Sequence, residues 1–247
     1  MKIRFHGVGC VDRDTLDRNI AHSKSLGLPA AKNGGRNRLA VIGGGHSILD
    51  HVDELRNFDG DRWIIAGAFR WCLENGISGT FFNVDPQDFI ADLAYGAEKA
   101  IVASCTHPAL FDTMKDKDVQ VFDLISEGDM INHGSSAATA VPVLSVQCDY
   151  REIVFYGCDS SYEHGGWTHA YEDAKDQYGL VVKCNNETFY TTPALLLQAE
   201  YLSTMIRIAP HVFKEKSGGF LRAQIADQEY DLTHATRALY EFLGAYA

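Results

Sequence analysis

Residues Leu39–Asp50 read LAVIGGGHSILD, and this stretch decides the fold. A short apolar run, LAVI, is typical of a buried strand, and three glycines follow it directly. Beyond the glycines, apolar residues recur at helical spacing, namely Ile48, Leu49, Val52 and Leu55. The stretch therefore predicts a strand, a tight turn and the start of an amphipathic helix.

The glycine turn has the composition of an anion-binding site. Glycine lets the backbone turn sharply and approach a ligand closely, and the N–H groups and dipole at a helix start favour a phosphate. Ser47 adds a hydroxyl that would donate to the ligand or cap the helix. A turn that binds nothing is the alternative, because the motif is neither GxGxxG nor GxxxxGK[ST]. The expected phosphate- or nucleotide-binding residues here are Gly43, Gly44, Gly45, His46 and Ser47.

Composition limits the function classes. The 22 basic and 33 acidic residues give a net charge of -11, which argues against a broad nucleic-acid surface. No apolar run reaches about 18 residues, and the N-terminus is charged too early for a signal peptide. The six cysteines are scattered without a CxxC pair, which predicts reduced, buried thiols in a cytoplasmic protein. We expect no membrane partner and leave homo-oligomerisation open.

Predicted strands and helices alternate after the glycine turn. The strands are expected at 63–68, 79–84, 99–104, 119–125 and 152–156, and the helices at 69–75, 107–114 and 135–147. Earlier, 1–8 reads as a strand and 14–26 as a helix. This rhythm predicts an α/β fold with a Rossmann-like, mainly parallel sheet and helices on both faces.

The C-terminal part has another pattern. A β-hairpin is expected around Asn185 and Asn186, then a helix at 193–208, a last strand at 220–225 and a helix at 233–245. We therefore divide the chain into three parts. They are an N-terminal strand and helix extension (1–38), a Rossmann-like nucleotide-binding core (39–175), and a C-terminal hairpin with helices packed on the core (176–247).

Polar residues follow the carboxyl ends of successive predicted strands. In parallel α/β sheets ligands bind beyond those ends, so we interpret the repetition as one shared site, with ordinary loop chemistry as the alternative. The residues that would contribute are Gly67 and Arg70, Asn83 and Asp85, Ser104, Thr106 and His107, and then Asp159, Ser160 and Ser161.

Residues 156–171 read YGCDSSYEHGGWTHAY, a long loop rich in aromatic and titratable side chains. Such loops are often functional. Asp159 would bind a metal, a ribose or a substrate hydroxyl, and His169 or His164 would act as a general base. A lid packed by its own aromatic residues is the alternative. The aromatic residues that would stack on a base or bond to a phosphate are Tyr162 and Tyr171.

The motifs GGGHS, NVDPQ, HPALFD and GCDSSYEHGGWTHAY, spread over 39–171, together resemble the MptE-like (DUF115) family in its bacterial and phage versions. That family is typed by archaeal 6-hydroxymethylpterin diphosphokinase. Related domains are similar to motility-associated glycosyltransferases and to sialyltransferases that use CMP-sugars. The resemblance implies a Rossmann-like transferase that binds a nucleotide.

The resemblance also implies roles for residues. The turn glycines and Ser47 would contact the nucleotide phosphates, Asp85 and Asp159 would be catalytic acids that hold Mg²⁺, and His169 would be a base or phosphate ligand. The chain departs from the family pattern at Gly67, where many relatives have Asn, and at His46, which replaces a Pro.

Three functions remain open. The first is diphosphoryl transfer from ATP, with Mg²⁺, to a small molecule that carries a hydroxymethyl group. The second is glycosyl transfer from a CMP-sugar or another nucleotide sugar, without a cofactor. The third is nucleotide binding without catalysis, which the departures at Gly67 and His46 favour. We expect the first, with a nucleotide and a small-molecule acceptor as partners. The acceptor would contact Tyr162, Trp167 and Tyr171.

Overall fold

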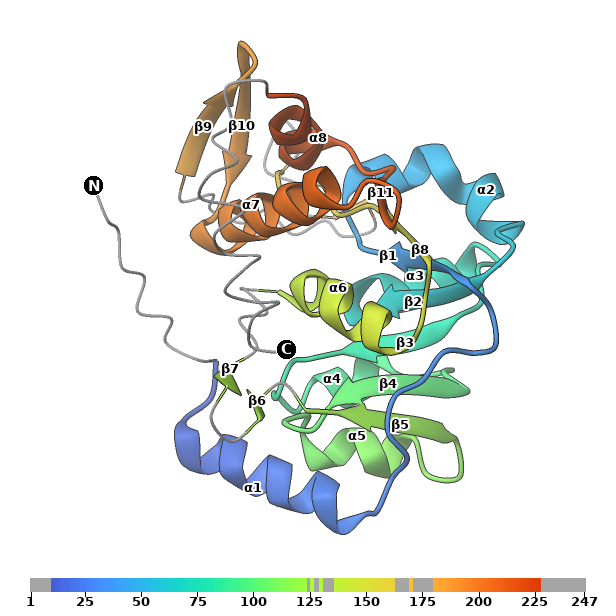
Figure 1. Ribbon diagram of the computed structural model, residues 1–247. Coiled ribbons are helices and arrows are strands. Elements are labelled where there is room, and N and C mark those ends of the chain that lie inside the picture. Colours follow the sequence, from blue (N-terminus) through green and yellow to red (C-terminus); the bar gives the residue numbers. More distant parts are fainter. Residues whose placement is uncertain are drawn as a thin grey trace.

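Seven strands form one sheet in the computed structural model, which describes residues 10–123, 125–126, 129–130, 136–162, 169–170 and 180–227. The strand order is β11-β8-β1-β2-β3-β4-β5, and every neighbouring pair is parallel (Figure 1). The strands are β1 Arg38–Ile42, β2 Asp61–Ile65, β3 Thr80–Asn83, β4 Lys99–Ala103, β5 Asp118–Phe122, β8 Glu152–Tyr156 and β11 Phe213–Glu215. The predicted Rossmann-like α/β fold is confirmed.

The helices and two small antiparallel sheets complete the described chain. The helices are α1 Arg13–Ser25, the 3-10 helix η1 His46–His51, α2 Val52–Arg56, α3 Ala66–Glu74, α4 Ile90–Leu93, α5 Pro108–Thr113, α6 Ala137–Gln147, α7 Pro193–Ile208 and α8 Gly219–Ala226. The small sheets pair β6 Ile125–Ser126 with β7 Asp129–Met130, and β9 Leu180–Cys184 with β10 Glu187–Thr191.

The sheet separates two apolar cores. Because successive side chains of a strand point to opposite faces, Ala40 and Ile42 of β1 pack with η1, α2, α3 and α5, whereas Leu39 and Val41 pack with α6 and α7. Trp63 lies in the second core, stacked on Phe82 at a ring-centroid distance of 5.3 Å. Helices therefore cover both faces of the sheet, as the sequence predicts.

The order of the strands reverses beside β1. From β1 to β5 the chain moves outward one strand at a time, with its helices on one face. Helix α6 then returns the chain across the other face to β8, which pairs with the free side of β1, and α7 leads on to β11 (Figure 1). Chain connections leave β1 and β8 in opposite directions, which opens a crevice at their carboxyl ends.

Most predicted elements are present, and the differences have local causes. Residues 220–225 form helix α8 and not a strand, and β11, which the sequence did not predict, joins the core sheet from the predicted C-terminal extension. The predicted strand 63–68 ends at Ile65, because α3 begins at Ala66. The hairpin is confirmed, with Asn185 and Asn186 at φ values of 50° and 64° as a two-residue hairpin turn requires. The predicted elements at 1–8 and 233–245 lie outside the described residues.

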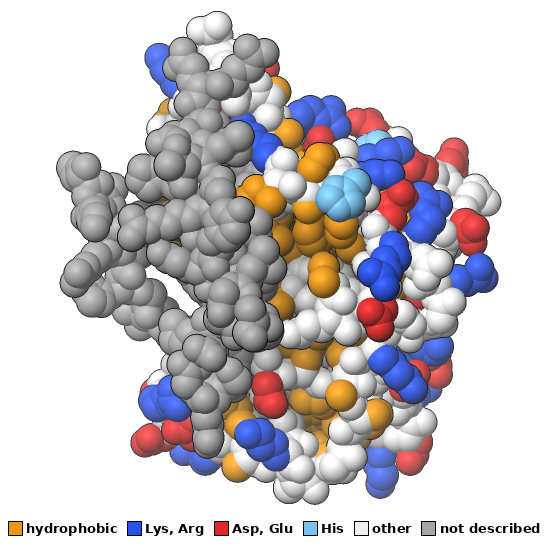
Figure 2. All heavy atoms as spheres, in the orientation of Figure 1, with side chains coloured by type: hydrophobic (Ala, Val, Ile, Leu, Met, Phe, Trp, Pro, Cys, Tyr) orange, Lys and Arg blue, Asp and Glu red, His pale blue; other side chains and the backbone are white. Residues whose placement is uncertain are grey.

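The described surface mixes charges of both signs. Figure 2 shows Lys and Arg interspersed with Asp and Glu around the rim of this face, and apolar side chains in its middle. No described helix has the length and apolar composition needed to cross a bilayer. All six cysteines are unpaired, and every one except Cys10 is buried, as predicted for reduced thiols.

Candidate functional site

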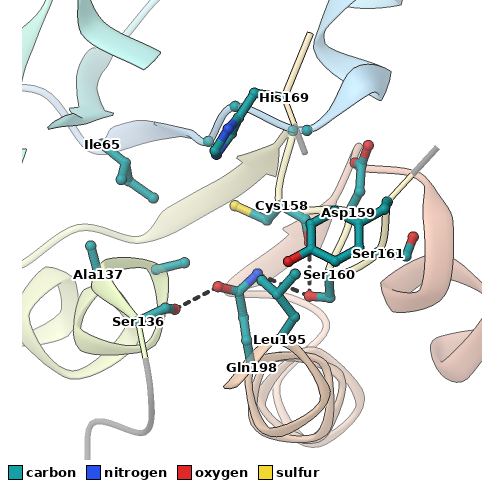
Figure 3. Close-up of a pocket in the computed structure, with 16 residues that line it drawn as sticks. Ile65, Ser136, Ala137, Cys158, Asp159, Ser160, Ser161, His169, Leu195 and Gln198 are labelled. Atoms are coloured by element: carbon teal, nitrogen blue, oxygen red, sulfur yellow. Dashed lines mark hydrogen bonds between the residues drawn. The ribbon is translucent and has the colours of Figure 1, made fainter. Parts of the chain in front are cut away.

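A cleft of about 280 Å³ lies beyond the carboxyl ends of β1 and β8. Its walls come from the loops that follow these two strands and from the N-terminal parts of α6 and α7 (Figure 3). The lining residues are Gly43, Gly44, Gly45, Ile65, Ser136, Ala137, Ala138, Gly157, Cys158, Asp159, Ser160, Ser161, Tyr162, His169, Leu195 and Gln198. The cleft thus occupies the place where doubly wound sheets bind their ligands.

The turn glycines bring the two loops together. Gly43 N donates to Tyr156 O at 2.8 Å, and Gly45 N donates to Gly157 O at 2.7 Å. A Cβ atom on Gly43 would lie 2.5 Å from Gly157 O, and Gly157 itself has a φ of 61°. The sequence interpretation assigned these glycines to the close approach of a ligand. In the structure Gly43 and Gly157 permit the close approach of one backbone to the other, and Gly43, Gly44 and Gly45 all line the cleft.

The side chain of Asp159 lies at the helix start where the sequence analysis predicted a bound phosphate. Its Oδ2 accepts from Ser47 N at 2.9 Å, and its Oδ1 accepts from Ser47 Oγ and, at 2.8 Å, from Gly218 N. The residue is only 5% exposed, and these three hydrogen bonds occupy three of the four lone pairs of its carboxylate. The predicted phosphate contact at Ser47 is therefore filled by the protein's own anion. The helix there also begins as a 3-10 turn and not as an α-helix.

The segment that starts α8 forms an outer layer around the cleft. Ser217 Oγ accepts from Cys158 N at 2.9 Å, Leu221 N donates to Asp159 O at 3.0 Å, and Phe220 N donates to Ser161 Oγ at 3.1 Å. The sequence interpretation missed this segment. The triplet Ser-Gly-Gly at 217–219 could have indicated it, because two adjacent glycines mark a turn or a close approach between backbone segments.

His169 lies in the cleft, across from Ser136 and Gln198 (Figure 3). Its position is set by the next residue, because Ala170 N donates to Gly44 O at 3.0 Å. Cys158 also lines the cleft, but burial raises the pKa of its thiol far above neutrality. A thiol with such a pKa stays protonated, and an imidazole is the side chain most often used for general acid–base catalysis, so His169 is the candidate for proton transfer.

Gln198 joins two serines at the opposite wall. Gln198 Oε1 lies 2.5 Å from Ser136 Oγ, and Gln198 Nε2 lies 2.9 Å from Ser160 Oγ. These residues come from α7, from the position before α6 and from the loop after β8. Ser136 was not predicted, although a serine before a run of small apolar residues is a readable helix start.

Several predicted site residues do not line the cleft. Arg70 pairs with Glu74 at 3.1 Å and its side chain is 85% exposed, because it points outward from α3. Gly67 lies in the first turn of α3. Ser104 is buried and faces a separate groove beside α1 and β5. His46 lies in η1, and its buried Nε2 has no partner among the described residues.

The two predicted acids are not brought together. Asp85 is absent from the lining residues given above, and its Oδ1 accepts from Gln87 N at 2.9 Å. Within the described ranges, no three His, Cys, Asp or Glu residues are grouped so that they could hold a metal ion. Protein-bound Mg²⁺ needs only one or two carboxylates beside substrate phosphates, so binding of Mg²⁺ with ATP stays a prediction. Trp167, Tyr171 and His164 lie outside the described residues.

Comparison with known proteins supports the fold. No family model and no curated protein matches the sequence, so the resemblance to the MptE-like family stays a prediction. Among solved structures, the MAf glycosyltransferase from Magnetospirillum magneticum AMB-1 superposes with a TM-score of 0.60 over 92% of this chain, at 15% identity. The match covers 41% of that protein's length. At this identity the likeness shows a shared fold.

Proposed function

We propose that the protein is a glycosyltransferase that uses a nucleotide-activated sugar. The observation that carries the proposal is the cleft at the reversal of strand order, with His169 on one wall and hydroxyl and amide groups on the other. The shared fold with a motility-associated glycosyltransferase supports the reaction class. Because this chain matches less than half of that protein, the proposal concerns the cleft and not the whole relative.

The charges around the cleft favour glycosyl transfer over diphosphoryl transfer. Transfer of a diphosphate requires Lys, Arg or metal ions to neutralise charge on several phosphate oxygens. None of the described lining residues is Lys or Arg, and Asp85 lies elsewhere. The first turn of α6 does face the cleft through Ala137 and Ala138. Its N–H groups and dipole suit one leaving phosphate.

The proposed reaction assigns the proton transfer to His169. The imidazole takes the proton of the acceptor hydroxyl, and the acceptor oxygen forms a bond to the anomeric carbon. The bond between that carbon and the phosphate oxygen breaks, and its electron pair leaves with the nucleotide. The N-terminus of α6 stabilises the negative charge that grows on the leaving phosphate.

Binding and turnover test the proposal separately. The chain is screened by thermal shift with CMP-, UDP- and GDP-sugars and with ATP, each with Mg²⁺ or with EDTA. We expect one nucleotide sugar to raise Tm, since a ligand at about one hundred times its Kd stabilises a fold by about 2.7 kcal/mol. His169→Gln should retain that binding and lose transfer, whereas His211→Gln, an exposed histidine beyond α7, should retain both. Stabilisation by ATP alone, and only with Mg²⁺, would contradict the proposal.

A further inference from the structure

The contacts between Ser136, Gln198 and Ser160 form a continuous hydrogen-bonded chain along one wall of the cleft (Figure 3). Gln198 and Ser160 are buried residues, at 6% and 3% exposure. A third contact continues the chain, because Ser160 Oγ lies 3.2 Å from Cys158 O. Thr191 Oγ1 donates to Ser160 O at 2.9 Å and holds the serine backbone in place.

The direction of every bond in this chain is determined by its last member. A backbone carbonyl such as Cys158 O can only accept, so Ser160 must donate its single hydroxyl proton there. Ser160 can then only accept from Gln198, which fixes the amide nitrogen of Gln198 toward Ser160. The amide oxygen therefore faces Ser136, and Ser136 must donate to it.

Both serine hydroxyls have thus used their proton inside the protein. A hydroxyl has one proton and two lone pairs, so Ser136 and Ser160 retain only acceptor capacity for a ligand. We call this pair of oxygens, Ser136 Oγ and Ser160 Oγ, the acceptor wall. A phosphate at neutral pH also presents acceptors almost exclusively, so its oxygens would oppose lone pairs at the wall. The hydroxyl groups of a sugar ring can donate to it.

We propose that the acceptor wall binds the hydroxyl groups of a sugar ring and that Gln198 is the positioning residue that makes the wall selective for hydrogen-bond donors. The proposal rests on the proposed function and names the part of the ligand that meets this wall. It reverses the sequence interpretation of Ser160 as a phosphate ligand. The ring is either the ribose of the nucleotide or the transferred sugar, which share this chemistry.

Removal of one wall oxygen tests the proposal. The probes are the nucleotide sugar that binds the wild-type chain, its 2′,3′-dideoxy nucleotide counterpart, and inorganic pyrophosphate, each titrated calorimetrically. Ser136→Ala should lower the affinity for the nucleotide sugar by about 3- to 10-fold, because one hydrogen bond is lost, and leave the affinity for pyrophosphate unchanged. Ser145→Ala is the matched control, because this buried serine of α6 donates to Pro142 O and does not line the cleft.

The dideoxy nucleotide sugar distinguishes the two rings. If Ser136→Ala weakens it too, the transferred sugar lies at the wall. If Ser136→Ala affects only the ribose-bearing ligand, the ribose lies there. Both results support the proposal. The proposal would be overturned if Ser136→Ala lowered the affinity for pyrophosphate as much as the affinity for the nucleotide sugar.

Gln198→Leu gives a second result that a purely structural role would not produce. Without the amide, Ser136 recovers its proton and can donate to a ligand. We expect weaker binding of the nucleotide sugar but equal or tighter binding of pyrophosphate, and equal loss of both would contradict the positioning role. If the wild-type chain binds no nucleotide sugar, the proposed function fails. Free monosaccharides at high concentration then test the wall alone, and their failure to bind would overturn the inference as well.

Discussion

Two regions at the carboxyl edge of the same sheet contrast in what they do with polar residues. In the cleft region, the loops 43–47 and 157–162 pack against each other and, with the starts of α6 and α7, enclose a cavity. In the α1 region, which comprises α1 and the loops 84–87 and 104–107, polar groups form hydrogen bonds with one another. There, Asn83 Nδ2 donates to Asp85 O and to Thr106 Oγ1, and Asn19 Nδ2 of α1 donates to Cys105 O and Pro86 O.

The contrast comes from the connections between strands. Beside β1 the chain leaves β1 and β8 toward opposite faces of the sheet, and the cleft lies at the carboxyl ends of these two strands. Between β3 and β4 all connections lie on one face, and the buried Asn19 anchors α1 to the loops beyond these strands. In this sheet, polar residues after a strand line the cleft where the strand order reverses, and they bond to one another between β3 and β4.

The largest expected effect concerns the packed glycine backbones of the cleft region. Gly157 and Gly27 have nearly equal φ values of 61° and 60°, but a Cβ would lie 2.6 Å from Gly43 O at the first and meet nothing within 4 Å at the second. Gly157→Ala should lower the free energy of unfolding by about 3 kcal/mol, and Gly27→Ala, at the end of α1, by about 1 kcal/mol. Urea denaturation measures both. Equal losses would show that the loops of the cleft region are not in close backbone contact.

The two acids that the sequence treated alike should differ next. In Asp159→Asn the new NH₂ group replaces one carboxylate oxygen. It then faces either Ser47 N or Gly218 N, so that two hydrogen-bond donors oppose each other. We expect a loss of about 2–3 kcal/mol, since a buried hydrogen bond to a charged group is removed. Asp85→Asn can keep its bond from Gln87 N and should change stability by less than about 0.5 kcal/mol. A larger loss at Asp85 would reverse the comparison.

Asn19→Leu should weaken the α1 region without changing the cleft. The substitution leaves two buried carbonyl oxygens, Pro86 O and Cys105 O, without their donor. Unfolding free energy should fall by about 2 kcal/mol. Ligand affinity, measured calorimetrically on the folded variant, should equal that of the wild type. A parallel loss of affinity would indicate that the two regions form one site.

The smallest expected effect depends on pH and concerns Glu54, which accepts hydrogen bonds from Tyr156 and Lys216. Burial alone would raise the pKa of Glu54, but hydrogen bonds from Lys216 and Tyr156 outweigh it and lower that pKa. A carboxyl with a lowered pKa stabilises the fold above its unfolded pKa, which is 4.5 in the free side chain, and loses that contribution as pH falls further. Because the side chain is 39% exposed, solvent screens the interaction, and Glu54→Gln should cost at most about 1 kcal/mol at pH 7.

Thermal unfolding between pH 3 and pH 7 checks this expectation. The difference between the wild type and Glu54→Gln should shrink as the pH falls below 4.5. Tyr156→Phe removes one of the two donors and should show a smaller difference with the same trend. A difference that does not depend on pH would remove Glu54 as a charged link between α2, β8 and the segment before α8.

Local patterns were sufficient to predict most of the sheet. The alternation of strands and helices predicts parallel pairing, and the apolar runs at β1, β3, β4 and β8 are buried on both faces. The segment 220–225 was assigned wrongly because its apolar residues fit either period. The turn at Gly218 and Gly219, where Gly219 has a φ of 54°, starts a helix through bonds to Asp159 and Ser161.

The site was less predictable, because it depends on contacts between distant segments. The sequence predicts that the glycine turn and the loop after β8 share one site, and the described residues Gly43, Asp159 and His169 do line one cleft. Nothing in the sequence shows that β8 pairs with β1. This pairing brings Asp159 to Ser47, whereas Asp85 follows β3 and does not line the cleft. The link from Gln198 to Ser160 spans 38 positions and has no local signature.

Hydrogen–deuterium exchange with mass spectrometry tests the central claim most directly, since it reports ligand protection at both regions in one experiment. The full chain is labelled with and without the nucleotide sugar that stabilises it. Protection is predicted at 43–47 and 136–138, with no change at 83–87 and 104–107. Protection confined to 83–87 and 104–107 would place the ligand in the α1 region and contradict the account.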